Sequence, residues 1–415
     1  MTSALSGYTV VDLTTGSAGA QCTQFLADHG ARVVRVVGRD DTALREGGFV
    51  IWDRSKECVR LDLENAEIGG SGPASEAYTA LVRCADVLVE DYPPSAPEQR
   101  LVRFEALRDV NPGLVACSIT AYGKDGPWKD EPARDDLVLA RMGILGSMPG
   151  FRPAPVHVVH PLPSVGACVL AVLGIASALY ARQTTGVGRE VATTLMAGAL
   201  LYHPKVTGEK LDAHTFQTHP SGSAPFYSNY ECADGNWVQL GCVHAGFIGI
   251  AGRVLGITET LAEPRFGEGR APIDDAADAE LRGILADILR TRPYAEWAEA
   301  FETADVPYAP ARWTSESMED PQVQHNEMVL ELEDPVVGSI EQTGIGLKLE
   351  ETPGAVRGPR QDALPLNELP AELPVAPEPA TGAGSEAVQP QSPPLEGVRI
   401  LEITNLIAGP TGGRL

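Results

Sequence analysis

The sequence has few basic residues for its length. It contains 32 lysines and arginines against 56 aspartates and glutamates, which gives a formal net charge of −24. Proteins that bind nucleic acids or anionic membrane surfaces present a basic face, so this balance argues against both kinds of partner. One cleft with a few cations for a phosphorylated ligand stays possible, because net charge says little about a single site.

Paired cysteines and targeting segments are also missing. The seven cysteines are scattered, no Cys-x-x-Cys occurs, and no signal-peptide pattern is present. We therefore expect free thiols and a cytoplasmic location. The longest apolar run, Val165–Tyr180, is short for a membrane span and is interrupted by glycine and serine, which favours a buried core helix.

Neither a metal site nor a nicotinamide fingerprint is expected. His157 with His160, and His214 with His219, lack a cysteine or carboxylate at metal-ligand spacing. The run Gly186–Gly188 is not a G-x-G-x-x-G motif, and it follows a predicted helix instead of a strand. We expect no permanently bound cofactor.

Strand-like and helix-like segments alternate in the first half of the chain. Tyr8–Leu13 and Ala31–Val37 have strand patterns and flank a helix that ends at Gly30. The alternation predicts an α/β fold with a parallel, doubly wound, Rossmann-like sheet. A long helix, Ser164–Arg182, and a strand, Glu190–Thr194, follow. Further expected elements are strands at Cys58–Leu63, Ala85–Glu90 and Leu114–Thr120 and helices at Ala74–Arg83 and Phe104–Val110.

The later part of the chain has a different pattern of predicted elements and a different composition. A hairpin turning at Asp234-Gly235 and helices at Asp278–Arg290 and Tyr294–Thr303 predict a smaller α+β domain. Residues 351–394 are rich in proline, alanine, glycine and glutamate, which predicts an extended linker. We expect a large domain over 1–215 with a return segment over 326–350, a small domain over 216–325, the linker over 351–394, and the start of a second copy over 395–415.

The expected second copy comes from a repeat. The opening of the chain recurs near its other end at a constant offset of 395 − 5 = 390 residues. A period of this length is one whole domain and not a solenoid repeat, so we expect the N-terminal copy of a tandem protein. The matched pairs are Leu5 with Leu395, Gly7 with Gly397, Thr14 with Thr404, and Ala18-Gly19 with Ala408-Gly409.

An ordered set of motifs resembles the class III CoA-transferase (CaiB/BaiF) family from about Leu5 to Leu349. The resemblance implies a large and a small domain joined into a ring, with two rings interlocked as a dimer. It also implies acyl-CoA and a carboxylic acid as partners, and either a homodimer or an intramolecular pseudo-dimer. The motifs are Val11-Asp12-Leu13, Leu26–Ala31, Leu61-Asp62-Leu63, Ala85–Tyr92, Asn111–Val115, Tyr122-Gly123, Gly126-Pro127, Asp136-Leu137-Val138 and Pro225-Phe226-Tyr227.

The resemblance implies an aspartate nucleophile at the start of the long helix, where this chain has Ser164. No aspartate or glutamate occurs between Phe151 and Tyr180. A carboxylate that attacks a thioester forms a reactive mixed anhydride, whereas an acylated serine is a less activated ester and needs a base to form. We therefore expect Ser164 to cap the helix and not to act as the nucleophile.

Other family positions also depart from the pattern. The racemase branch of the family has a His-Asp pair where this chain has Asp135-Asp136, so the base histidine is absent. The pair Asp135-Asp136 is an alternative source of a carboxylate for the chemistry. The simpler role of Asp136 is to cap or orient the segment before the long helix. Ser17 stands where transferases often have a glutamine.

CoA contacts implied by the resemblance follow the ends of strands, at Arg39, Lys56, the loop Asp91-Tyr92-Pro93 and Arg100. Cations beside the carboxyl ends of strands suit a 3′-phosphate and a pyrophosphate. The alternative is that Lys56 and Arg100 are ordinary surface charges. Asp40-Asp41 dilute the charge of Arg39.

Three functions remain open from the sequence. The first is CoA transfer between carboxylic acids, with the catalytic aspartate supplied by the second copy. The second is a non-catalytic CoA-binding or dimerisation half. The third is acyl-CoA racemase, isomerase or lyase chemistry through Asp135 or Asp136.

Overall fold

The computed structural model describes residues 2–38, 47–148, 155–202, 222–270, 272–366, 393–404 and 412. These residues form two compact units. The first unit contains the described residues up to Met142, those from His160 to Tyr202, and those from Val329 onward; the second contains the described residues of 143–159 and 222–328.

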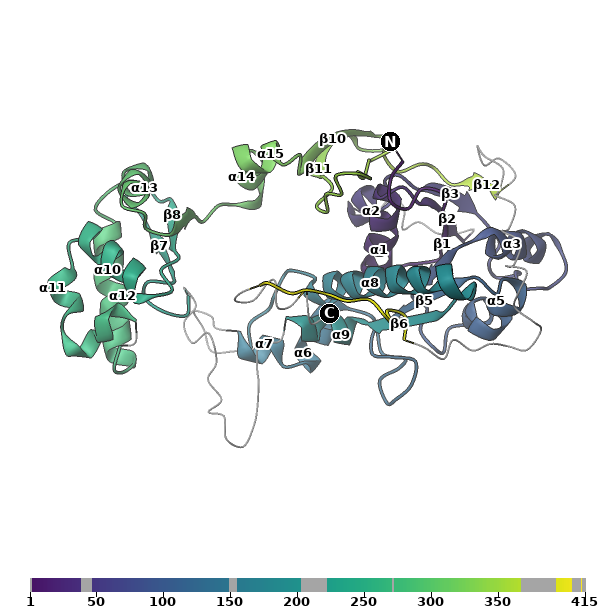
Figure 1. Cartoon of the computed structure of the whole chain (residues 1–415), viewed down its shortest axis with the longest axis horizontal. Coiled ribbons are helices and arrows are strands. Elements are labelled where there is room, and N and C mark those ends of the chain that lie inside the picture. The colour runs from purple at the N-terminus through teal and green to yellow at the C-terminus, as the bar shows by residue number, and fades with distance from the viewer. Residues whose placement is uncertain are drawn as a thin grey trace. The chain divides into compact units, whose positions relative to one another are not determined.

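A parallel sheet of seven strands organises the first unit (Figure 1). Its strands are β1 Thr9–Asp12, β2 Arg32–Val37, β3 Glu57–Arg60, β4 Val87–Glu90, β5 Val115–Thr120, β6 Glu190–Thr194 and β12 Leu364–Pro365. The spatial order is β12-β3-β2-β1-β4-β5-β6. From β3 to β6 this is the doubly wound order of dinucleotide-binding folds, and the predicted α/β fold is confirmed.

Helices cover both faces of this sheet because strand side chains alternate between faces. Val11 packs in one core with Leu81 and Leu101 from the helices on its side. The adjacent Asp12 points to the opposite face, where it contacts Thr23. The helices of this unit are α1 Ser17–Asp28, α2 Gly47–Trp52, α3 Pro73–Cys84, α4 Gln99–Val102, α5 Phe104–Val110, α6 Asp135–Arg141, α8 Leu162–Thr185 and α9 Leu195–Leu201.

The long apolar helix α8 packs against α1, α9, β5 and β6 (Figure 1). It ends where Gly186 takes a left-handed φ of 69° and its N–H donates to the carbonyl of Arg182. Among the described helices α8 alone is long and apolar enough to cross a membrane by length and composition. Its packing inside the first unit is that of the core helix predicted from the sequence.

The contact between α8 and α9 depends on two facing glycines. A Cβ on Gly166 would lie 2.4 Å from the carbonyl oxygen of Gly198. We expect Gly166→Ala to lower the free energy of unfolding by about 1–3 kcal/mol, since the two helices must separate. Gly283→Ala is the matched control, because no atom lies within 4 Å of its Cβ and alanine favours an exposed helix. Urea unfolding compares the two variants, and equal stabilities would contradict this packing.

The second unit combines an antiparallel sheet with helices around its own core. Phe226, Leu240, Leu285, Trp297 and Phe301 are buried together there. The strands are β7 Asn229–Glu231, β8 Trp237–Leu240 and β9 Tyr308–Pro310, and the helices are α7 Ile144–Ser147, α10 Ala245–Val254, α11 Thr258–Leu261, a 3₁₀ helix at Pro264–Gly269, α12 Asp275–Leu289, α13 Tyr294–Thr303, α14 Thr314–Met318 and α15 Pro321–His325.

The predicted linker begins later than its composition suggests. Strands β10 (Val329–Asp334) and β11 (Gly338–Thr343) form an antiparallel pair in the first unit. Beyond them, Arg357 donates to the carbonyls of Ala31 and Ser55 at 2.8 Å, and β12 pairs with β3. The prediction of a linker from 351 is therefore wrong as far as 366, because arginines tie this proline-rich segment to the sheet edge. The rest of the predicted linker over 367–392, and the predicted boundary at 215, lie outside the described residues.

Candidate active site

The loops after β1 and β4 meet at the switch point of the sheet, where ligands of open α/β folds bind. Asp91 follows β4, and its carboxylate accepts hydrogen bonds from the backbone N–H of Thr15 at 2.8 Å and of Gly16 at 2.6 Å. Burial raises the pKa of Asp91, while these hydrogen bonds oppose the shift. Gly16 immediately precedes α1, so Asp91 anchors the loop that starts this helix.

Three helices begin at one point beside this loop. Ser17 is the first residue of α1, Asp135 is the first residue of α6, and Ser164 lies in the first turn of α8. The backbone N–H of Ser164 donates to Asp135 Oδ1 at 2.7 Å, and Ser164 Oγ donates to Oδ2 at 2.8 Å. Ser17 Oγ donates in turn to Ser164 Oγ at 2.9 Å. We call Ser17, Asp135 and Ser164 the helix junction.

The geometry changes the role predicted for Ser164. Its side chain caps no backbone N–H of α8; it donates to Asp135, whose other oxygen accepts the N–H of Ser164. The prediction that Ser164 caps α8 is therefore wrong. Asp135 instead accepts the hydrogen bond from the backbone N–H of Ser164 in the first turn of α8. Ser164 is 2% exposed, whereas Asp135 is only partly buried.

Asp136 is separate from the helix junction. Its two oxygens accept hydrogen bonds from the guanidinium of Arg134 at 3.2 and 3.1 Å near the protein surface. These hydrogen bonds lower the pKa of Asp136. Successive residues of a helix point about 100° apart, so only one of the two aspartates faces Ser164. That residue is Asp135. The prediction that Asp136 orients the segment before the long helix is therefore wrong, because its carboxylate is held by Arg134 instead.

Lys56 is a buried structural charge. Its side chain is 1% exposed, and Nζ lies 2.9 Å from Asp12 Oδ2, 2.8 Å from Thr23 Oγ1, 3.1 Å from the carbonyl of Ala20 and 3.2 Å from Asp53 Oδ1. These partners use the three N–H donors of the ammonium. The structure therefore contradicts the predicted contact of Lys56 with a CoA phosphate.

The other predicted CoA contacts are dispersed. The guanidinium of Arg100 donates to the carbonyls of Leu63 at 2.6 Å, Glu64 at 2.7 Å and Pro97 at 2.8 Å, so it joins two loops. Next to Asp91, Tyr92 is buried and Pro93 is exposed. Burial raises the pKa of the Tyr92 hydroxyl. Arg39 lies outside the described residues.

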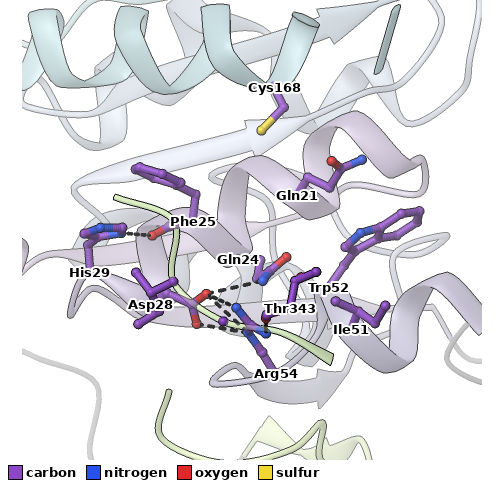
Figure 2. Close-up of a pocket in the computed structure, with 13 residues that line it drawn as sticks. Gln21, Gln24, Phe25, Asp28, His29, Ile51, Trp52, Arg54, Cys168 and Thr343 are labelled. Carbon is purple, nitrogen blue, oxygen red and sulfur yellow. Dashed lines mark hydrogen bonds and ion pairs between the residues drawn. The ribbon is translucent and has the colours of Figure 1, made fainter. Parts of the chain in front are cut away.

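A pocket of about 220 Å³ lies between α1, α2, α8 and residues 343–346 (Figure 2). Gln21 and Cys168 line it, each four residues after Ser17 and Ser164 on the same helices. Phe25, Ile51 and Trp52 supply apolar and aromatic surface, as is typical of small-molecule pockets. The sequence did not indicate this pocket, because it joins segments more than 300 residues apart.

Charged groups close one side of this pocket. Arg54 Nη2 lies 2.7 Å from Asp28 Oδ2 (Figure 2), and Arg54 Nη1 donates to Gln342 Oε1 at 2.9 Å. Arg54 is 1% exposed, so it anchors the pocket wall. Burial raises the pKa of Cys168 to about 12, which excludes a reactive thiolate there at neutral pH. In the described parts of the chain, no group of three or more His, Cys, Asp or Glu residues could hold a metal ion.

The fold and the site define a class of protein. It is a doubly wound α/β protein with a carboxylate at the meeting point of three helices and a small pocket lined by two of these helices, α1 and α8. The chain belongs to CoA-transferase family III, whose model matches residues 5–362. The family predicted from the sequence is thus confirmed, and CoA thioesters are the substrates of this family.

Similar proteins of known activity support the assignment. An acetyl-CoA:oxalate CoA-transferase of Acetobacter aceti is 29% identical over 389 residues, which are 88% of this chain and 95% of that protein. The CoA-transferase/lyase DddD of a Marinomonas species is 27% identical over 98% of this chain but only 54% of its own length. A CaiB/BaiF family protein of Brucella suis has the same fold, with a TM-score of 0.73 at 21% identity over 88% of this chain and 97% of that one.

Proposed function

We propose that this chain binds acyl-CoA and takes part in moving CoA to a carboxylic acid. The observation that carries the proposal is the helix junction, which holds a carboxylate against the residue at the family's nucleophile position. Transfer of a thioester requires a carboxylate and the thiol of CoA itself, so no resident cofactor is invoked. The free thiols of all seven cysteines support a cytoplasmic location.

The size of the pocket favours a substrate with a small acyl or acceptor group. Its volume of about 220 Å³ lies below the usual range of drug-sized pockets. Two of its lining residues, Gln21 and Cys168, lie one helical turn after Ser17 and Ser164 on α1 and α8. An acetyl or short dicarboxylate group fits this space better than a long acyl chain. The Acetobacter relative is named for acetyl-CoA and oxalate, which are substrates of this size.

A second copy of the domain is part of the proposal. On α8, Val169, Leu173 and Tyr180 are 44%, 37% and 53% exposed, and such an apolar helix face favours contact with another protein surface. A homodimer or an intramolecular pseudo-dimer would cover it. The repeat at Leu395, and the Marinomonas relative of about twice this length, support the pseudo-dimer. An aspartate at position 164 + 390 = 554 of the reading frame supports a catalytic second copy, and a serine there contradicts it.

Two alternatives have specific support. Ser164 in place of the family aspartate favours a non-catalytic CoA-binding half. Asp135 at the position of the racemase histidine, together with the transferase/lyase relative, favours lyase, isomerase or racemase chemistry.

Incubation of the full chain with acetyl-CoA and a panel of carboxylic acids separates these functions. We expect saturable CoA binding by calorimetry and a new acyl-CoA that appears only with an acceptor. Binding without exchange identifies the non-catalytic half, and loss or isomerisation of the acyl group without an acceptor identifies the third function. Absence of CoA binding and of any reaction would contradict the proposal.

A further inference from the structure

Resting on the proposed function, we propose that Asp135 is the acyl-accepting carboxylate of this copy and that Ser164 positions it. The family's nucleophile would then be moved from α8 to the start of α6, within the same small space. The family pattern does not assign this role to Asp135, and the sequence offers Asp135 or Asp136 only for racemase, isomerase or lyase chemistry.

The carboxylate of Asp135 lies where the carboxylate of a family nucleophile would lie. An aspartate at position 164 would carry its carboxylate one atom beyond Cβ, in the space into which Ser164 Oγ now points. That hydroxyl lies 2.8 Å from Asp135 Oδ2. The carboxylate of Asp135 thus occupies the neighbourhood in which the family carboxylate would lie, although it comes from another helix.

The carboxylate of Asp135 is held in one orientation. Both oxygens of Asp135 are held by Ser164, one by its backbone N–H and one by its hydroxyl, and Ser17 orients that hydroxyl from α1. Each carboxylate oxygen keeps a further lone pair for attack. A nucleophile that two hydrogen bonds already hold in place loses little further conformational freedom when it reacts.

The electrostatic surroundings of Asp135 also suit a nucleophile. Within the described part of the chain, the oxygens of Asp135 accept hydrogen bonds only from Ser164, and no cation pairs with them. The partial positive charges of the N-termini of α1 and α8, of 12 and 24 residues, lie at the junction. They stabilise the ionised carboxylate and also the negative charge that develops on the attacked thioester oxygen.

The proposed reaction balances without another reagent. One oxygen of Asp135 attacks the thioester carbonyl, the C–S bond breaks, and CoA leaves as a thiolate with the bonding electron pair. The thiolate attacks the carbonyl carbon of Asp135 in the mixed anhydride, which releases the donor carboxylate and leaves an aspartyl-CoA thioester. The acceptor carboxylate displaces CoA from this thioester. Thiolate attack on the acceptor's carbonyl then forms the new acyl-CoA and restores Asp135.

Chemical trapping on the full chain tests the assignment. The protein is mixed with acetyl-CoA, treated with hydroxylamine and digested with trypsin, which releases the peptide Asp135–Arg141. We expect a hydroxamate at Asp135 by tandem mass spectrometry. Asp135→Asn should lose the hydroxamate and about a thousandfold of the exchange rate while it keeps CoA binding. Asp136→Asn, one residue away, should change the rate less than about threefold.

Each outcome decides the question. A hydroxamate at another residue with exchange intact overturns the role of Asp135 and leaves the proposed function standing. CoA binding with no exchange also overturns it and favours the non-catalytic half. Absence of both CoA binding and exchange overturns the proposed function as well. Because trapping is done on the unmodified chain, poor folding of a variant does not affect the result.

Discussion

Lys56→Met is expected to lower the free energy of unfolding by about 3–5 kcal/mol. The side chains of Lys56, Asp12 and Asp53 are at most 4% exposed, and Nζ lies 2.9 Å from Asp12 and 3.2 Å from Asp53. Methionine fills the same space but removes the positive charge, which leaves Asp12 without its closest cation in the core. Thermal or urea unfolding measures the loss, which corresponds to a fall in Tm of about 10 °C for a domain of this size.

Two control variants separate charge from packing. Lys129→Met removes an exposed lysine and should change stability by less than about 0.5 kcal/mol. Asp12→Asn combined with Lys56→Met removes both charges of the pair and should recover part of the loss. If Lys56→Met is as stable as the parent chain, the buried ion cluster contributes nothing and this account of Lys56 is wrong.

The stability lost in Lys56→Met should depend on pH. Burial favours the neutral form of Asp12, but Lys56, Arg35 and two threonines outweigh it, so its pKa is lowered. A lowered pKa stabilises the fold above the unfolded value of about 3.9, and this contribution is lost only as the pH falls through the folded value. Without Lys56, burial raises the pKa of Asp12 relative to the parent chain. Protonation of Asp12 at low pH therefore stabilises the variant. The stability difference between the two chains should therefore shrink as the pH is lowered from 7 towards 4.

Moving the carboxylate back to α8 should rescue CoA exchange. Asp135→Ser alone is expected to lose about a thousandfold in rate, because the acyl-accepting group is gone. Asp135→Ser combined with Ser164→Asp places a carboxylate and a hydroxyl in the same space with their helices exchanged. We expect the pair to recover most of the lost rate, to within about tenfold of the parent chain.

The exchange rates of the single and double variants, measured with the same acyl-CoA and acceptor, test this rescue. Asp136→Ser serves as the control for changing charge at the start of α6. A double variant as inactive as Asp135→Ser would contradict the idea that the position of the carboxylate matters more than the helix that carries it.

The sheet could be predicted from the sequence because its signals are local. Valine-rich strands such as Arg32–Val37 alternate with helical segments, and short-range pattern fixes both. The family, too, follows from the order of short motifs. These are properties of neighbouring residues, and burial or long-range contact does not change them.

The site could not be predicted in the same way, since it depends on contacts between distant residues. Lys56 stands at a sequence position that predicts contact with a CoA phosphate. Its actual partners, Asp12 and Thr23, come from β1 and α1. The choice between Asp135 and Asp136 depends on which of them faces α8 across 29 residues of chain. Similarly, composition suggests a linker at Arg357, whose partners lie more than 300 residues earlier.

We claim that a carboxylate of this chain, at the helix junction, exchanges an oxygen atom with the substrates of CoA transfer. The most direct test supplies acetyl-CoA and an acceptor carboxylate labelled with heavy oxygen, and then weighs the tryptic peptide Asp135–Arg141. The reaction sequence predicts that one heavy oxygen enters the Asp135 carboxylate with each round of turnover. An unlabelled Asp135 in a chain that has formed the new acyl-CoA would contradict the claim.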